Sequence, residues 1–149
     1  TKRRARMSNK VFVTHEFNCQ PETLFQWLTQ ADKVVQWFWP NEFKALSAQS
    51  EAYSGGSYKV QLQKDNGDIF WLEGKYTEVL PFSKIEYEYQ YVGLPGTPNS
   101  SVVRMHISPT GTSQCILKLS QEFDLEVQVS PSRGKAWEAM LLRLARLTL

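Results

Sequence analysis

The chain has 149 residues, a length typical of one domain that buries a hydrophobic core. Hydrophobic residues make up 42% of it and charged residues 21%, values that argue against wholesale disorder, collagen-like repeats and a coiled coil. The net charge of +2 averages three regions, because residues 1–10 carry +5, residues 11–130 carry −6 and residues 131–149 carry +3.

Further classes are excluded by the arrangement of residues. No run approaches the roughly 18 consecutive apolar residues of a membrane span, and no apolar signal-peptide core follows the basic N-terminus. We therefore expect a soluble cytoplasmic protein. Cys19 and Cys115 lie far apart without further ligands at metal-binding spacing, so we expect two buried thiols, no metal and no cofactor. Residues 1–9 lack apolar periodicity and are predicted to be a disordered or vector-derived basic tail, which leaves 10–149 as a single domain.

The N-terminal part of that domain predicts a strand and two short helices. From Lys10 onward polar and apolar residues alternate, which is typical of a strand. Pro21 then begins a short amphipathic helix. A second helix is expected over residues 32–37, with Asp32 as its N-cap and an end before Pro40.

Residues 43–123 predict an antiparallel meander of six strands separated by turn residues. One side of these strands is apolar and aromatic, and the other is polar and rich in acidic side chains. In the stretch 69–79, Gly74 interrupts the apolar row, which predicts a bulge or a close approach of the backbone.

The last element is predicted to be a long amphipathic helix, with Ser130 as its cap and Pro131 as its first residue. Its apolar stripe comprises Trp137, Met140, Leu141, Leu144 and Leu147, and its opposite side carries Lys135, Arg143 and Arg146. A sheet with one apolar face and a helix with one apolar stripe bury these surfaces against each other. The expected fold class is therefore α+β, in the order strand, two short helices, six strands and a long C-terminal helix on a strongly bent antiparallel sheet.

Motifs that carry a reaction are missing from the sequence. It has no nucleophile elbow, phosphate-binding loop, dinucleotide fingerprint or His-x-x-x-His pair, so we predict no catalytic residue. His106 falls on the polar side of its strand. His15 shares a row with Val13 and Phe17, where it is either a hydrogen-bonded core residue or a polar group of an interior site. The negative charge of residues 11–130 argues against a nucleic-acid partner.

The aromatic content is unusual, because eight Phe, six Tyr and five Trp are present. Rings on the inward rows fit a filled core, and they equally fit a cavity that holds a small apolar ligand. The residues predicted to line such a cavity are Trp37, Trp39, Tyr58, Phe70, Tyr76, Tyr87, Tyr89, Met105, Trp137, Met140 and Leu141, with His15 as a polar group.

The order of several loose motifs resembles the family of activator-of-Hsp-90-ATPase homologues, within the START-like, Bet v-like (SRPBCC) superfamily. The segment 15–40 carries Leu24-Phe25, Thr29 and Trp37-Phe38-Trp39-Pro40 of the family's opening, although Gln20 and Gln30-Ala31 depart from its usual residues. The similarity continues through residues 55–58, 71–79, 81–85 and 137–144. The resemblance implies a helix-grip fold, in which a curved sheet wraps around the C-terminal helix and a cavity lies between them. It implies no shared catalytic set.

Three functions follow from these observations. The first is binding of a small hydrophobic molecule, such as a lipid, between the C-terminal helix and the sheet, without catalysis. The second is a co-chaperone-like interaction with an Hsp-90-type ATPase, for which the separated acidic and basic surfaces are suited. The third is an aromatic-cyclase-like enzyme, which is a known activity of the superfamily. The oligomeric state stays open.

Overall fold

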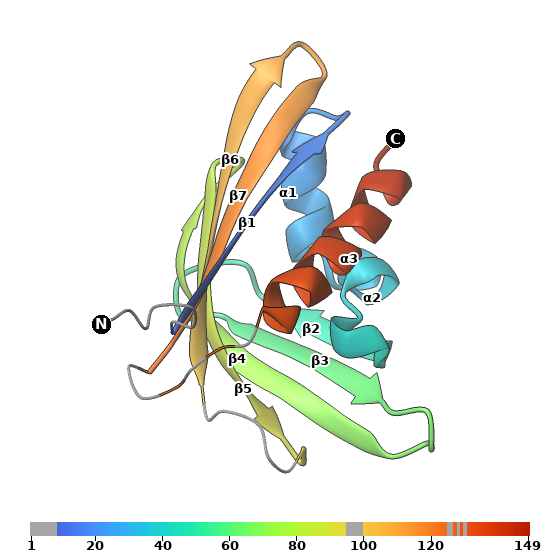
Figure 1. The fold of residues 1–149 in the computed structure, drawn as a ribbon. Helices are drawn as coiled ribbons and strands as arrows, with labels where there is room; N and C mark the ends of the chain where they lie inside the picture. Colours follow the sequence, from blue (N-terminus) through green and yellow to red (C-terminus); the bar gives the residue numbers. More distant parts are fainter. Residues whose placement is uncertain (1–8, 95–99, 125–126, 128, 130) are drawn as a thin grey trace, which may run out of the picture.

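A seven-stranded antiparallel sheet bends around the C-terminal helix (Figure 1). The computed structural model describes residues 9–94, 100–124, 127, 129 and 131–149. The predicted basic tail falls outside these residues except for Asn9, and so does the predicted cap Ser130. The α+β helix-grip arrangement expected from the sequence is confirmed.

The strands follow the chain order except at one edge. β1 (Lys10–Phe17) lies beside β7 (Gln114–Phe123), so the sheet order is β1-β7-β6-β5-β4-β3-β2. The predicted meander of six strands is confirmed, and its other members are β2 (Lys44–Ser50), β3 (Ser57–Gln63), β4 (Ile69–Leu80), β5 (Lys84–Val92) and β6 (Ser101–Gly111). Alternate residues of these strands are buried, which places one apolar face toward the helices.

Gly74 is the point of closest approach between β4 and β5. A Cβ atom at this position would collide with the backbone carbonyl of Glu88, so only glycine fits. The ladder shifts by one residue shortly afterwards, between Tyr76 and Glu78. The predicted close approach is confirmed, and the bulge increases the bend of the sheet.

A single residue, Gln30, connects the two short helices. α1 (Pro21–Thr29) starts with proline, and α2 (Ala31–Trp37) follows after Gln30, whose backbone is extended. The Gln30 N–H donates to the carbonyl of Gln26, and its own carbonyl accepts the N–H groups of Lys33 and Val34 at 3.0 and 2.9 Å. Gln30 thus ends α1 and caps α2. The prediction of Asp32 as the cap is wrong, because Asp32 already lies in the first helical turn.

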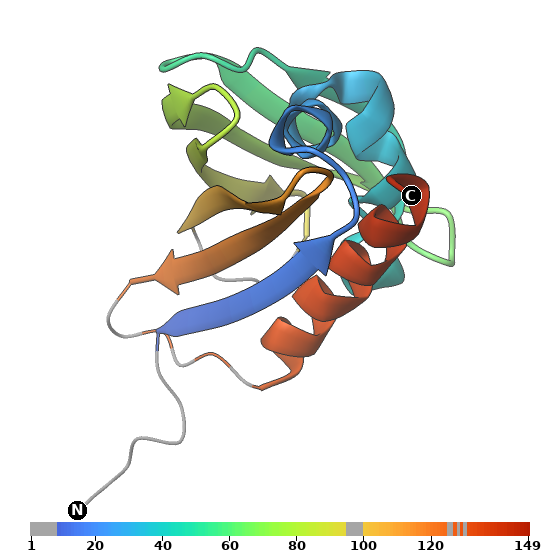
Figure 2. The same cartoon turned by 90° about the horizontal axis from the view of Figure 1, so that it is seen from above.

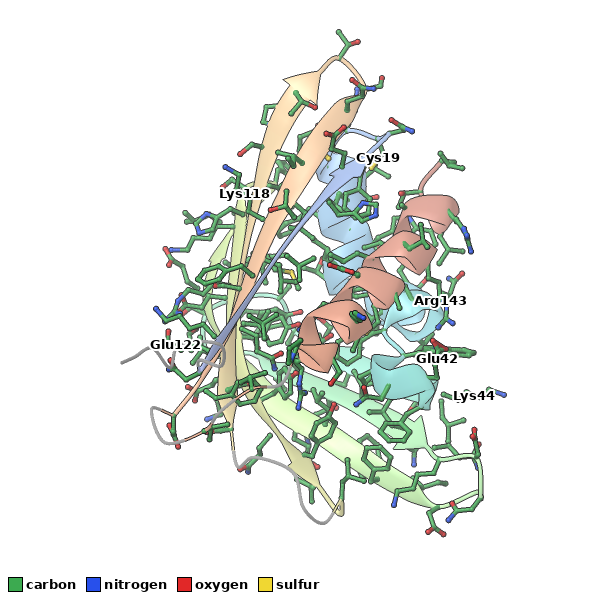
Figure 3. All side chains as sticks on the ribbon, viewed as in Figure 1. Cys19, Glu42, Lys44, Lys118, Glu122 and Arg143 are labelled. Atoms are coloured by element: carbon green, nitrogen blue, oxygen red, sulfur yellow. The ribbon has the colours of Figure 1, made fainter. Side chains whose placement is uncertain are left out.

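The chain then passes through η1 (Pro40–Glu42), a 3₁₀ turn that alternation patterns did not predict. Asn41 and Glu42 both have positive φ angles, of 52° and 63°. The carboxylate of Glu42 accepts from Arg143 at 3.2 Å, and the Arg143 guanidinium lies 4.4 Å from the centre of the Trp39 ring. Figure 3 shows this pair on the side of the molecule remote from the outer sheet face.

The long helix α3 (Ser132–Leu147) runs along the open side of the bent sheet, next to β1 (Figure 2). It begins one residue later than predicted, because Pro131 serves as its N-cap. Four residues of the predicted stripe, Trp137, Met140, Leu141 and Leu144, are buried, whereas Leu147 is 37% exposed at the helix end. Among the described residues, no helix has both the length and the apolar character that a bilayer crossing requires.

The outer face of the sheet is charged, as predicted. Arg104 donates to Glu86 at 3.0 Å and to Glu122 at 2.8 Å, and the second hydrogen bond lowers the pKa of Glu122 below its usual value. His106 is exposed on the same face, as its place in the alternation predicts.

Candidate functional site: the inner tyrosine cluster

Five tyrosines lie together on the inner face of the sheet. They are Tyr58 on β3, Tyr76 on β4, and Tyr87, Tyr89 and Tyr91 on β5. Tyr58 stacks on Tyr87 with ring centres 4.5 Å apart, and successive β5 rings are 5.9 and 6.1 Å apart. Side chains occupy the space between sheet and α3 (Figure 3). We call these five residues the tyrosine cluster.

The register of the strands brings these rings together. Tyr76 lies opposite Tyr87 in the β4–β5 ladder, and Tyr58 and Tyr89 lie opposite Gly74 from its two sides. Gly74 has no side chain, and across β4 the ring of Tyr58 on β3 stacks on that of Tyr87 on β5. Gly74, which the close approach of the Glu88 backbone requires, thus also influences how the aromatic rings pack.

A buried amide connects the tyrosine cluster to α3. Gln121 on β7 is fully buried, and its Nε2 donates to the hydroxyl of Tyr89 at 2.7 Å and to that of Ser101 at 2.9 Å. Its Oε1 accepts from the indole Nε1 of Trp137 at 2.8 Å. An indole N–H can only donate, so this contact fixes the orientation of the amide. All hydrogen-bonding groups of the Gln121 side chain are therefore engaged.

Hydroxyls of the tyrosine cluster differ in their partners. Tyr76 shares a 2.6 Å hydrogen bond with Ser50. The hydroxyl oxygens of Tyr87 and Tyr91 are buried, and neither makes a well-formed hydrogen bond to a residue that the structure describes, although the Tyr58 hydroxyl lies close enough to that of Tyr87 to affect its pKa. Burial is the main cause that raises the pKa of every phenol in the cluster, to about 12 for Tyr76. At neutral pH these groups are protonated hydrogen-bond donors.

A small recess reaches the tyrosine cluster at the end where α3 begins. It has a volume of about 10 Å³, and its walls include Tyr89, Tyr91, Gln121, Phe123 and Arg133. The guanidinium of Arg133 lies 5.2 Å from the centre of the Phe123 ring. A space of this size holds roughly one water molecule, so a larger occupant displaces side chains at this mouth.

Most of the residues predicted to line a cavity belong to one buried core. Trp37, Tyr58, Phe70, Tyr76, Tyr87, Tyr89, Met105, Trp137, Met140 and Leu141 are all in it. Trp39 is partly exposed, and the guanidinium of Arg143 covers part of its ring. The half-buried His15 contacts Phe17, with ring centres 5.0 Å apart, and its Nδ1 lies 2.8 Å from the Glu16 carbonyl. The role of all these residues as ligand contacts stays a prediction.

Sequence reasoning missed Gln121, Ser101 and Arg133. Gln121 carried a signal, since it follows Cys115, Leu117 and Leu119 on an otherwise apolar inward row. A polar residue in such a row predicts a buried hydrogen-bond network. Arg133 carried none, because its environment depends on how the end of β7 meets the start of α3.

The thiols are structural. Cys19 and Cys115 are buried and free, as predicted, and burial raises the pKa of Cys115 to about 12, so the thiol stays protonated. The described residues contain no group of three or more side chains suited to hold a metal ion.

Known proteins resemble this chain in sequence and in fold. A family model described as Activator of Hsp90 ATPase homolog 1-like protein matches residues 18–148. A solved structure from Chromobacterium violaceum has a TM-score of 0.81 at 21% identity, over 94% of this chain and 96% of that one. One from Rhodobacter sphaeroides has a TM-score of 0.80 at 14% identity, over 93% and 91%.

A third solved structure, of the AHSA1 protein from Silicibacter pomeroyi, has a TM-score of 0.72 at 19% identity, over 93% of this chain and 96% of that one. At these identities the likeness concerns the fold alone. The comparison with curated proteins gives no match. Because the family model spans nearly the whole length, the chain belongs to the Activator of Hsp90 ATPase homolog 1-like family.

Proposed function

We propose that the protein binds a small, mainly apolar molecule with a hydrogen-bond acceptor, between the tyrosine cluster and α3. One observation carries this proposal: the buried hydroxyls of Tyr87 and Tyr91 make no well-formed hydrogen bond to a described residue. Leaving a buried polar group unpaired costs about 1–3 kcal/mol. An acceptor on a ligand recovers this free energy, whereas a hydrocarbon does not.

The surroundings of these hydroxyls suit such a ligand. Aromatic and aliphatic core side chains surround them together with a few oriented polar groups, a composition that is typical of small-molecule sites. The raised pKa values keep the phenols protonated, so they act as donors toward the ligand. Entry takes place where Phe123 and Arg133 form the mouth of the recess and requires these side chains to move.

A fluorescent ketone tests the proposal. Prodan is an uncharged naphthalene whose carbonyl accepts hydrogen bonds and whose emission reports polarity. We expect saturable binding to the wild type with one site. The double variant Y87F/Y91F should bind about two- to tenfold more weakly, because the carbonyl of prodan loses its hydrogen bond to a phenol, and such a bond contributes roughly 0.5–1.5 kcal/mol.

The matched control is Y53F, since Tyr53 is 60% exposed and lies outside the tyrosine cluster. This variant should bind prodan as the wild type does. Absence of saturable binding to the wild type, or equal losses in Y53F and Y87F/Y91F, would overturn the proposal.

Family membership supports a second function, an interaction with an Hsp90-type chaperone. Such an interaction uses the outside of the molecule, where Lys135 and Arg146 of α3 are exposed. It would appear as stimulation of the chaperone's ATPase that weakens with salt. Since Tyr87 is buried, Y87F should leave this stimulation unchanged, which separates the two functions.

A further inference from the structure

The recess at the start of α3 is rich in hydrogen-bond donors. Gln121 uses both N–H groups of its amide on the hydroxyl oxygens of Tyr89 and Ser101. Both hydroxyls therefore act as acceptors toward Gln121, which leaves their own protons to be donated elsewhere. The Tyr91 hydroxyl adds a third donor without a partner among the described residues.

The buried amide oxygen at the recess is already in use. The Gln121 Oε1 accepts from Trp137, and the phenol oxygens keep their protons because burial raises the pKa of Tyr89 and Tyr91. A site with several free donors and few free acceptors favours an occupant that only accepts. A carboxylate is such a group.

Arg133 adds a positive charge to this site. It is half-buried, and among the half-buried arginines of the described chain it alone has no carboxylate partner. Arg104 pairs with Glu86 and Glu122, and Arg143 pairs with Glu42. The charge of Arg133 acts on the recess, because it opposes the rise of the pKa at Tyr89 and Tyr91. A partly desolvated cation without a counter-ion gains from an anion.

We infer that the ligand is a monocarboxylic acid with an apolar body, whose carboxylate is bound by Arg133 and by the hydroxyls of Tyr89 and Tyr91. The apolar body extends between the tyrosine cluster and α3. This inference rests on the proposed function, and it adds the ligand class and the direction in which the ligand lies.

Two molecules that share one apolar body test it. 2-Naphthoate carries the carboxylate, and methyl 2-naphthoate is its uncharged counterpart. By calorimetry at pH 7.5 we expect the wild type to bind the acid about tenfold more tightly than the ester. This factor corresponds to the lower end of the contribution that a hydrogen bond to a charged group makes. The R133Q variant should lose this preference, so that it binds the acid and the ester about equally.

R146Q is the matched control, because it removes the same charge from an exposed arginine of the same helix. It should keep the preference for the acid. R133K keeps a cation and should retain most of the preference, which covers the case in which R133Q does not fold.

The outcomes separate the two proposals. Equal binding of acid and ester by the wild type, or equal effects of R133Q and R146Q, overturns the carboxylate site and leaves ligand binding intact. Absence of binding for both naphthalenes and for prodan overturns the proposed function as well.

Discussion

Tyr87 and Tyr89 are two residues apart on the same face of one strand, yet their hydroxyls differ in hydrogen bonding. The Tyr89 hydroxyl accepts from Gln121, whereas the Tyr87 hydroxyl makes no well-formed hydrogen bond to a described residue. Their rings are buried to 6% and 2% exposure, so the two sites differ mainly in hydrogen bonding.

Removing each hydroxyl therefore changes stability in opposite directions. Y89F leaves an N–H of Gln121 unpaired and should lower the free energy of unfolding by about 1–3 kcal/mol. Y87F removes a buried hydroxyl without a partner and should raise it by roughly 1 kcal/mol. Urea denaturation measures both. A loss of stability in Y87F as large as that in Y89F contradicts this account.

At the scale of elements, the β4–β5 pair depends on Gly74. G74A places a methyl group against the carbonyl of Glu88, and the backbone must move to relieve the collision. We expect a loss of at least about 3 kcal/mol, at the upper end for single substitutions.

The control for this prediction is G67A, in the turn between β3 and β4. Gly67 has a φ of 95° but no atom within 4 Å of an added Cβ, so only backbone strain of about 1 kcal/mol is expected. Thermal or urea unfolding compares the two variants. Similar losses of stability in G74A and G67A would show that the close approach of Gly74 to Glu88 does not determine the cost of the substitution.

How much the sequence reveals also differs by element. Alternation located all six strands of the meander and the inward rows, because each depends only on neighbouring residues. The cap of α2 was misplaced because Gln30 acts through its backbone, which has no side-chain signature. Gln121 and Arg133 owe their roles to partners on other strands and on α3, and periodicity does not contain such partners.

For the whole molecule, the tyrosine cluster predicts sensitivity to alkali. Burial is the main cause that raises the pKa of all five phenols in the folded state, so they lose their protons at higher pH than in the unfolded chain, where the pKa is about 10. Their stabilising effect is complete below pH about 10 and is lost as the pH rises toward the folded values. Each phenol contributes a slope of roughly 1.4 kcal/mol per pH unit in this range.

Urea unfolding at several pH values from about 9 to 11.5 measures this loss. We expect the free energy of unfolding to fall steeply above pH about 10 and tyrosinate absorbance to rise in step with unfolding. The Y87F variant should show a smaller slope. Nearly full tyrosinate absorbance in a protein that remains folded at pH about 11 rules the explanation out.

The pairing of β1 with β7 also determines the order in which the chain can fold. Lys10 lies opposite Glu122, so β1 has no neighbour in the sheet until the chain has been synthesised through β7. Contacts between such distant residues close slowly, because a long loop must be ordered first. The hairpins β2 to β7 can form from neighbouring residues in the meantime. The strand that is synthesised first is therefore the last to join the sheet, and until then it exposes backbone groups that chaperones or other nascent chains can bind.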